Sequence, residues 1–136
     1  MNRPRVLLVD DIPEIVQYCI AILETDYEVV GSASNGLAAI RAVAAMAPDV
    51  IVLDISMPGL NGIEVARRLR REGCQATIVF LSADALSEVA MSAGGSAYVS
   101  KNLIDSDLKT AIAEALAGRR HVALGRNEAS RSEEQK

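Results

Sequence analysis

The chain has 136 residues, about half of them hydrophobic, with a formal net charge of −4 and one histidine. This length can bury one hydrophobic core without disulfides or metals, so we expect one folded domain. The acidic balance argues against direct binding of nucleic acid, and no apolar run approaches the roughly 20 residues that cross a bilayer. The N-terminal apolar stretch is too short for a signal peptide. We therefore expect a cytoplasmic protein that does not bind membranes.

The hydrophobic pattern alternates between short β-branched runs and longer stretches with a helical period. It predicts strands at 4–9, 28–33, 49–54, 77–82 and 96–100, and helices at 13–24, 36–46, 62–72, 85–93 and 105–117. Right-handed crossovers then place helices on both faces of one sheet. We expect an α/β, doubly wound, five-stranded parallel sheet in the order 2-1-3-4-5, a flavodoxin-like fold with its ligand site at the carboxyl edge.

Two regions of the pattern are weak. The helix at 85–93 spans only about two turns, because Gly94 and Gly95 stop it. The residues expected to face the core from this helix are Leu86, Val89, Ala90 and Ala93. From residue 119 the pattern dissolves into mixed charge. We expect one domain over residues 1–118 and a polar, disordered tail over residues 119–136.

Three acidic residues follow two of the predicted strands. Asp10 and Asp11 close the apolar run 6–9, and Asp54 closes the run 50–53. Because parallel strands point the same way, these carboxylates should converge at one edge of the sheet. Carboxylates that are this close raise one another's pKa or recruit a cation, and oxygen ligands suit Mg²⁺. The sequence therefore predicts a magnesium site at this edge.

Two further strands end in polar side chains, Ser82 and Lys101. A nucleophilic carboxylate, a metal-binding acidic pair, a hydroxyl donor and a fixed cation are together what phosphoryl transfer to an aspartate requires. Each residue alone has a simpler interpretation. Asp10 and Asp11 could cap the helix that starts at Pro13, and Lys101 could be a solvated surface charge. The joint pattern favours the phosphoryl-transfer interpretation.

These residues resemble the receiver domain of bacterial two-component response regulators, over about residues 4–118. The matching segments are Val9-Asp10-Asp11, Asp54 through Gly62, Leu81-Ser82-Ala83 and Tyr98-Val99-Ser100-Lys101. Each segment alone is a weak signal. Their order along the chain and their positions at strand ends make the combination highly specific.

The resemblance implies that Asp54 takes a phosphoryl group from the phosphohistidine of a sensor histidine kinase or of a phosphotransfer protein. It implies that Asp11, Asp54 and the carbonyl of Ser56 hold Mg²⁺, and that Asp10 acts through a metal-bound water. The protein would then assist its own phosphorylation and dephosphorylation without being an enzyme that turns over external substrates.

The resemblance also implies a switch. Ser82 would turn its hydroxyl toward a phosphoryl oxygen, and Lys101 would pair with the phosphate. Tyr98 would move inward toward Ser82, although a core or half-exposed strand tyrosine is an equal alternative. A downstream effector protein, or a second copy of the chain upon phosphorylation, would read the switch on three elements, which are helix 85–93, strand 96–100 and helix 105–117.

The chain departs from the common receiver pattern after its lysine. The usual next residue is a proline in a cis bond, whereas Asn102 follows Lys101 here. A non-proline cis bond costs about 2.5–4 kcal/mol, so the sequence leaves the geometry of this bond open.

Three alternatives to a stand-alone switch stay open. The chain could be the receiver half of a DNA-binding transcriptional regulator, because its last segments resemble receivers that precede a helix-turn-helix domain. It could hold an intact but unused pocket and bind its partner constitutively. A phosphohydrolase with an aspartyl-phosphate is disfavoured, because such enzymes usually place a second acid two positions after the nucleophile, where this chain has Ser56. Cys19 and Cys74 show no metal or redox spacing and favour reduced thiols.

Overall fold

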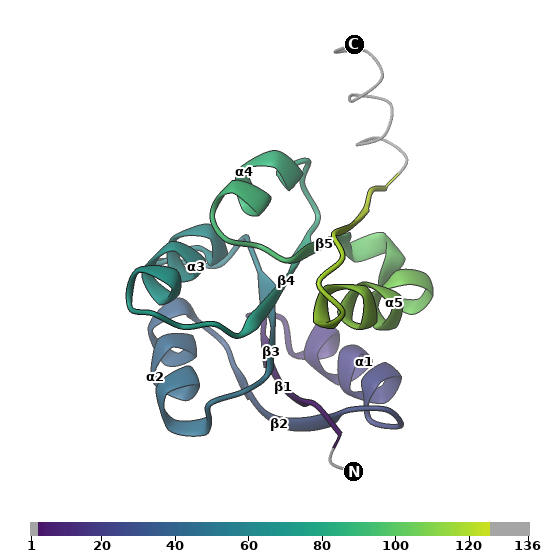
Figure 1. Cartoon of the computed structure of the whole chain (residues 1–136), viewed down its shortest axis with the longest axis horizontal. Coiled ribbons are helices and arrows are strands. Elements are labelled where there is room, and N and C mark those ends of the chain that lie inside the picture. The colour runs from purple at the N-terminus through teal and green to yellow at the C-terminus, as the bar shows by residue number, and fades with distance from the viewer. Residues whose placement is uncertain (1–2, 126–136) are drawn as a thin grey trace.

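The computed structural model describes residues 3–125, which form a six-stranded parallel sheet between two layers of helices (Figure 1). The sheet order is β2-β1-β3-β4-β5-β6. The strands are β1 (Arg5–Val9), β2 (Glu28–Ala33), β3 (Val50–Asp54), β4 (Thr77–Ser82), β5 (Ala97–Ser100) and β6 (His121–Ala123). The helices are α1 (Pro13–Leu23), α2 (Gly36–Met46), α3 (Gly62–Arg71), α4 (Ser87–Ser92), the 3₁₀ turn η1 (Lys101–Leu103) and α5 (Ile104–Leu116). The expected fold class and the order of the first five strands are confirmed.

The two helix layers create two hydrophobic cores. Helices α2, α3 and α4 cover one face of the sheet, and α1 and α5 cover the other (Figure 1). All five residues of β3 are buried, because this strand lies inside the sheet and is covered on both faces. The central strands are therefore rigid supports for the residues at their carboxyl ends. No helix within residues 3–125 is long and apolar enough to span a membrane.

Local sequence signals position the start of α3 against the end of β3. Asn61 caps α3, and its side chain and that of Glu64 form a reciprocal capping box. The next residue, Gly62, lies so close to β3 that a Cβ there would be 2.2 Å from the carbonyl oxygen of Asp54. Only glycine permits this approach. The start of α3 thus packs directly on the backbone of Asp54.

Strand β6 corrects the prediction that the chain is disordered from residue 119. It pairs in parallel with β5, and His121 lies opposite Ala97. Ala123 is buried and joins the core beneath α5. The physical reason is that β6 covers the unpaired backbone of an otherwise bare edge strand. Three residues are too few to show the alternation of a strand, and the residues around them are polar. The sequence pattern therefore did not indicate this strand. Residues 126–136 lie outside the described residues, and the prediction for them stays a prediction.

Helix α4 is shorter than predicted and faces the sheet differently. It begins at Ser87 rather than at residue 85, and Ala90 is its one fully buried residue. Val89 was predicted to face the core, which is wrong, because 45% of its surface is exposed. A helix of six residues presents only a narrow contact stripe to the sheet. That stripe is centred on Ala90, so Val89 lies on the outer side.

Candidate functional site

The carboxyl ends of three strands bring four charged side chains together. Asp10 follows β1, Asp54 ends β3, and both are buried. Asp11 lies beside them, and one carboxylate oxygen from each of the three lies within 4.8 Å of the others. The Nζ atom of Lys101, which follows β5, is 3.0 Å from Asp10 Oδ2 and 3.2 Å from Asp54 Oδ1. The acidic residues and the lysine predicted from the sequence therefore converge.

Backbone amides orient the two buried carboxylates. The amide of Ile12 donates to Asp10 Oδ1 at 2.9 Å, and the amide of Ser56 donates to Asp54 Oδ1 at 3.3 Å. The other oxygen of Asp54, Oδ2, is buried and has no hydrogen-bond partner among the described residues. A buried carboxylate oxygen without a donor is costly. This oxygen is therefore open to a cation or to a new covalent bond.

The electrostatics of the cluster are unbalanced toward negative charge. Burial, and then the neighbouring charge of Asp10, raises the pKa of Asp54 to about 6 although Lys101 opposes the rise. Burial tends to lower the pKa of Lys101, but its hydrogen bonds and charge interactions with Asp10 and Asp54 together raise it. The cluster thus contains three carboxylates and one ammonium, which contacts Asp10 and Asp54. A set of hard oxygen donors with excess negative charge can hold a divalent cation. A hollow of about 260 Å³ beside Asp10 and Asp11 lies next to the cluster.

Ser82 and Tyr98 share a hydrogen-bond partner in the loop after β4, which is the backbone of Asp84. The Ser82 hydroxyl donates to the carbonyl of Asp84 at 3.0 Å and accepts from the amide of Asp84 at 2.9 Å. The Tyr98 hydroxyl donates to the same carbonyl and accepts from the amide of Leu86 at 3.4 Å. Tyr98 is fully buried, so the half-exposed alternative is wrong. Its switching role stays a prediction.

Asp84 is the residue that sequence reasoning missed. Its backbone holds Ser82 and Tyr98, and its carboxylate accepts from the Ser56 hydroxyl at 3.3 Å. An aspartate in a loop has no periodic pattern around it that would mark it as functional. The role of Asp84 also depends on its backbone carbonyl, which every residue has. The bond that follows Lys101 is trans, as are the other peptide bonds of residues 3–125, and Lys101 begins η1.

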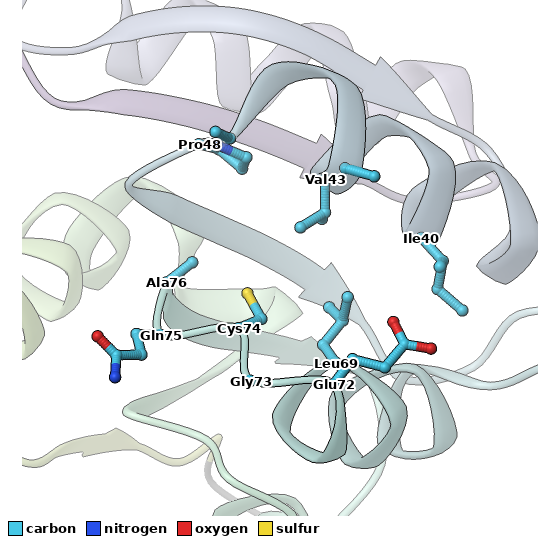
Figure 2. A pocket seen from close by; sticks show the side chains of 11 residues that line it. Ile40, Val43, Pro48, Leu69, Glu72, Gly73, Cys74, Gln75 and Ala76 are labelled. Carbon is cyan, nitrogen blue, oxygen red and sulfur yellow. The ribbon is translucent and has the colours of Figure 1, made fainter.

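A second hollow lies at the opposite end of the sheet, between α2 and α3 (Figure 2). It has a volume of about 390 Å³, and Val43 and Leu69 point into it with the sulfur of Cys74 (Figure 2). It lies where β4 begins, whereas the acidic cluster lies where the strands end. The other cysteine, Cys19, is buried, and burial followed by the charge of Asp10 raises its pKa to about 12. Neither cysteine is part of the acidic site.

Comparison with known proteins agrees with this geometry. The family described as the response regulator receiver domain matches residues 6–113. The nitrate/nitrite response regulator protein NarL of Escherichia coli K12 is 36% identical over 119 residues, which are 83% of this chain and 55% of NarL. A two-component response regulator of the LuxR family from Aurantimonas has a crystal structure with a TM-score of 0.87, 32% identity and 98% coverage of both chains. The chain belongs to the response regulator receiver domain family of two-component systems.

The relatives differ in what accompanies the receiver. The chain spans about half the length of NarL. It also matches a protein-glutamate methylesterase/protein-glutamine glutaminase from Nocardioides, with 40% identity over 104 residues that are 71% of this chain and 28% of that protein. Similar receivers therefore occur in proteins with different outputs, so the receiver alone does not define the output.

Proposed function

We propose that this receiver is a phosphorylation-switched signalling module that accepts a phosphoryl group on Asp54. The donor is the phosphohistidine of a sensor histidine kinase or of a phosphotransfer protein. One observation carries the proposal, which is that Lys101 contacts both Asp10 and Asp54 although the three residues come from three different strands. Receivers are generally signalling modules without substrates of their own, and we propose the same here.

The residues of the site support an in-line transfer. A carboxylate oxygen of Asp54 attacks phosphorus, the phosphorus–nitrogen bond of the phosphohistidine breaks, and the imidazole leaves with the electron pair. Lys101 then exchanges its contact with Asp54 for the phosphoryl oxygens. When bound, Mg²⁺ would supply positive charge at these oxygens. We assign it to Asp11, Asp54 and the carbonyl of Ser56, with Asp10 acting through water.

The polar contacts around Asp84 support a switch. If Ser82 turns toward a phosphoryl oxygen, it must release the carbonyl of Asp84, which Tyr98 also holds. The loop that leads into α4 then loses one of its anchors. We propose that an effector protein, or a second copy of the chain, reads this change on the surface of α4, β5 and α5. Strand β6 borders this surface, because it pairs with β5.

The test is direct phosphorylation. The protein is incubated with acetyl phosphate and Mg²⁺, and its intact mass is measured. We expect one added phosphoryl group in the wild type and none in the Asp54→Asn variant. Asp49→Asn, at an exposed position at the opposite end of β3, is the matched control and should label normally. Persistent labelling of Asp54→Asn would contradict the assignment.

A second candidate is the receiver half of a DNA-binding transcriptional regulator. The observation in its favour is that NarL is almost twice as long as the region that this chain matches. In that case phosphorylation at Asp54 would control a second domain. The length of the complete open reading frame distinguishes the two candidates.

A further inference from the structure

Strand β6 ends beside the turn that carries Lys101. Because β6 is parallel to β5, the chain leaves the sheet at the same edge as the acidic cluster. Two residues beyond β6, Gly125 is buried. A Cβ at this glycine would lie 3.0 Å from Ser100 Oγ and 3.5 Å from Asn102 Nδ2. The backbone at Gly125 therefore packs against both neighbours of Lys101.

The turn that Gly125 contacts, η1, has no buried residue of its own. Lys101 opens η1, a three-residue 3₁₀ helix without a side-chain cap. Such short helices have poor hydrogen-bond geometry, so packing decides their position. Yet the Lys101 ammonium is held against Asp10 and Asp54, which come from strands on the far side of β4. An outside contact that fixes the turn also fixes where this ammonium lies.

We propose that Gly125 is a positioning residue for phosphoryl transfer. It allows the chain after β6 to brace Ser100 and Asn102, and this brace holds Lys101 where the phosphoryl oxygens form. The proposal depends on the proposed function, because it assumes that Lys101 contacts the transferred group. Displacements of a fraction of an ångström at a reacting centre lower rates measurably. A side chain at position 125 should therefore slow the reaction without touching Asp54.

The experiment adds a methyl group at position 125 and then removes the Ser100 hydroxyl that this methyl group would contact. Gly125→Ala should lower the maximal rate of phosphorylation by acetyl phosphate and Mg²⁺ about three- to tenfold. The half-saturating concentration of acetyl phosphate should change little. Ser100→Ala removes the Oγ atom at 3.0 Å, so the double variant Gly125→Ala/Ser100→Ala should regain most of the wild-type rate. Ser100→Ala alone removes one of the two contacts of the brace and should slow labelling by a smaller factor than Gly125→Ala does.

A double-mutant cycle tests whether the effect passes through Lys101. In a Lys101→Ala background, which reacts slowly, Gly125→Ala should cause no further loss. Thermal melting by circular dichroism gives the folded fraction of each variant, and rates are expressed per folded molecule. Should Gly125→Ala melt below the assay temperature, Asn102→Ala is the second variant. This exposed side chain is the other one against Gly125, and its loss should slow labelling by a smaller factor.

The outcomes separate this inference from the proposed function. Wild-type protein that takes up no phosphate would overturn the proposed function. Labelled wild type with an unchanged rate in Gly125→Ala and in Asn102→Ala would overturn the brace alone. If Gly125→Ala is slow and the added Ser100→Ala substitution does not restore its rate, the brace is also overturned. The same holds if Gly125→Ala lowers the rate by the same factor in the Lys101→Ala background as in the wild type.

Discussion

Helix α3 follows β3, which ends at Asp54, and helix α4 follows β4, which ends at Ser82. The two helices are anchored to the rest of the domain very differently. Helix α3 has ten residues, a side-chain capping box and five buried residues, which are Gly62, Ile63, Val65, Ala66 and Leu69. Helix α4 has six residues, no side-chain cap and one buried residue, Ala90. Buried apolar area and caps each contribute on the order of 1 kcal/mol or more per group, so α3 is far the better anchored.

This difference divides the site into a fixed side and an adjustable side. Gly62 packs α3 onto the backbone of Asp54, so the proposed phosphoacceptor cannot move without disturbing a core. On the other side, the loop before α4 depends on hydrogen bonds from Ser82 and Tyr98 to one carbonyl. A net hydrogen bond contributes only about 1 kcal/mol. We therefore expect the proposed phosphoryl transfer on the fixed side and conformational change on the adjustable side.

Helix α4 is nevertheless clamped at its far end. The guanidinium of Arg70, on α3, donates to the carbonyl of Gly94 at 3.1 and 2.8 Å and to the carbonyls of Cys74 and Ala76. Gly94 adopts a φ of 108°, and a Cβ there would collide with the Arg70 side chain. The clamp means that α4 should pivot about its C-terminal end, while its N-terminal end follows the loop after Ser82.

The largest effect should come from the fixed side, where the fold holds Asp54 at an electrostatic cost. The pKa of Asp54 is about 6 against an ordinary value of 3.8. The folded state thus binds more protons than the unfolded state between these values, so stability falls as pH rises from about 4 to 6 and stays lower above that. The full difference is on the order of 3 kcal/mol. Without metal, Asp54→Asn should be more stable than the wild type at pH 8 by about 1–3 kcal/mol.

Urea unfolding in the presence of a chelator, at pH values from 4 to 8, measures this difference. The stability gain of Asp54→Asn should shrink toward pH 4, because the carboxylate of the folded wild type is protonated there and most of the cost of burying its charge is gone. Asp49→Asn, at the exposed opposite end of β3, removes a carboxylate outside the cluster and is the matched control. An Asp54→Asn variant that is less stable than the wild type at pH 8 would mean that the pair with Lys101 outweighs burial.

The next effect compares the two helices directly. Without phosphate, backbone amides of residues 84–92 should exchange with solvent about 100-fold faster than those of residues 63–71, because α4 has few buried contacts. Phosphorylation should slow exchange at residues 84–92 and leave α3 unchanged. Hydrogen exchange with mass spectrometry measures both, with Asp54→Asn as the control that should not respond. Equal protection of α3 and α4, unaffected by phosphate, would remove the distinction between the two sides.

The sequence predicted the fixed side well because its signals are local. Apolar runs that end in Asp10, Asp54 and Lys101 identify both the strands and the edge at which these residues meet. Right-handed crossovers then place the helices on both faces, and 2-1-3-4-5 is one of the common orders of such a sheet. The start of α3 is also a local signal, since Asn61 and Glu64 form a capping box over four residues.

The adjustable side could not be predicted to the same degree, because its contacts are few and non-local. Val89 was placed in the core from periodicity, but a six-residue helix is too short for periodicity to determine its buried face. The role of Asp84 depends on a backbone carbonyl, which leaves no trace in the sequence. Strand β6 is stabilised by pairing with β5, and no pattern within its own three residues indicates this.

The smallest effect concerns the cation that we propose for the fixed side. The carboxylates of Asp10, Asp11 and Asp54 lie within 4.8 Å of one another, so a cation that binds only the folded state should stabilise it. Free Mg²⁺ at about ten times its dissociation constant should add about 1.4 kcal/mol. Asp11→Ala should lose most of this gain and should itself be slightly more stable without metal, because one like charge is gone.

Thermal melts over a Mg²⁺ titration measure this gain. Glu14→Ala is the matched control, because Glu14 is an exposed acid in the first turn of α1 that lies outside the cluster. It should keep the wild-type response. Since Mg²⁺ would act on the side anchored by α3, hydrogen exchange at residues 84–92 should not change when Mg²⁺ is added without a phosphodonor. An unaltered response in Asp11→Ala would place the cation elsewhere. A Mg²⁺ effect on α4 alone would show that the two sides are already coupled before phosphorylation.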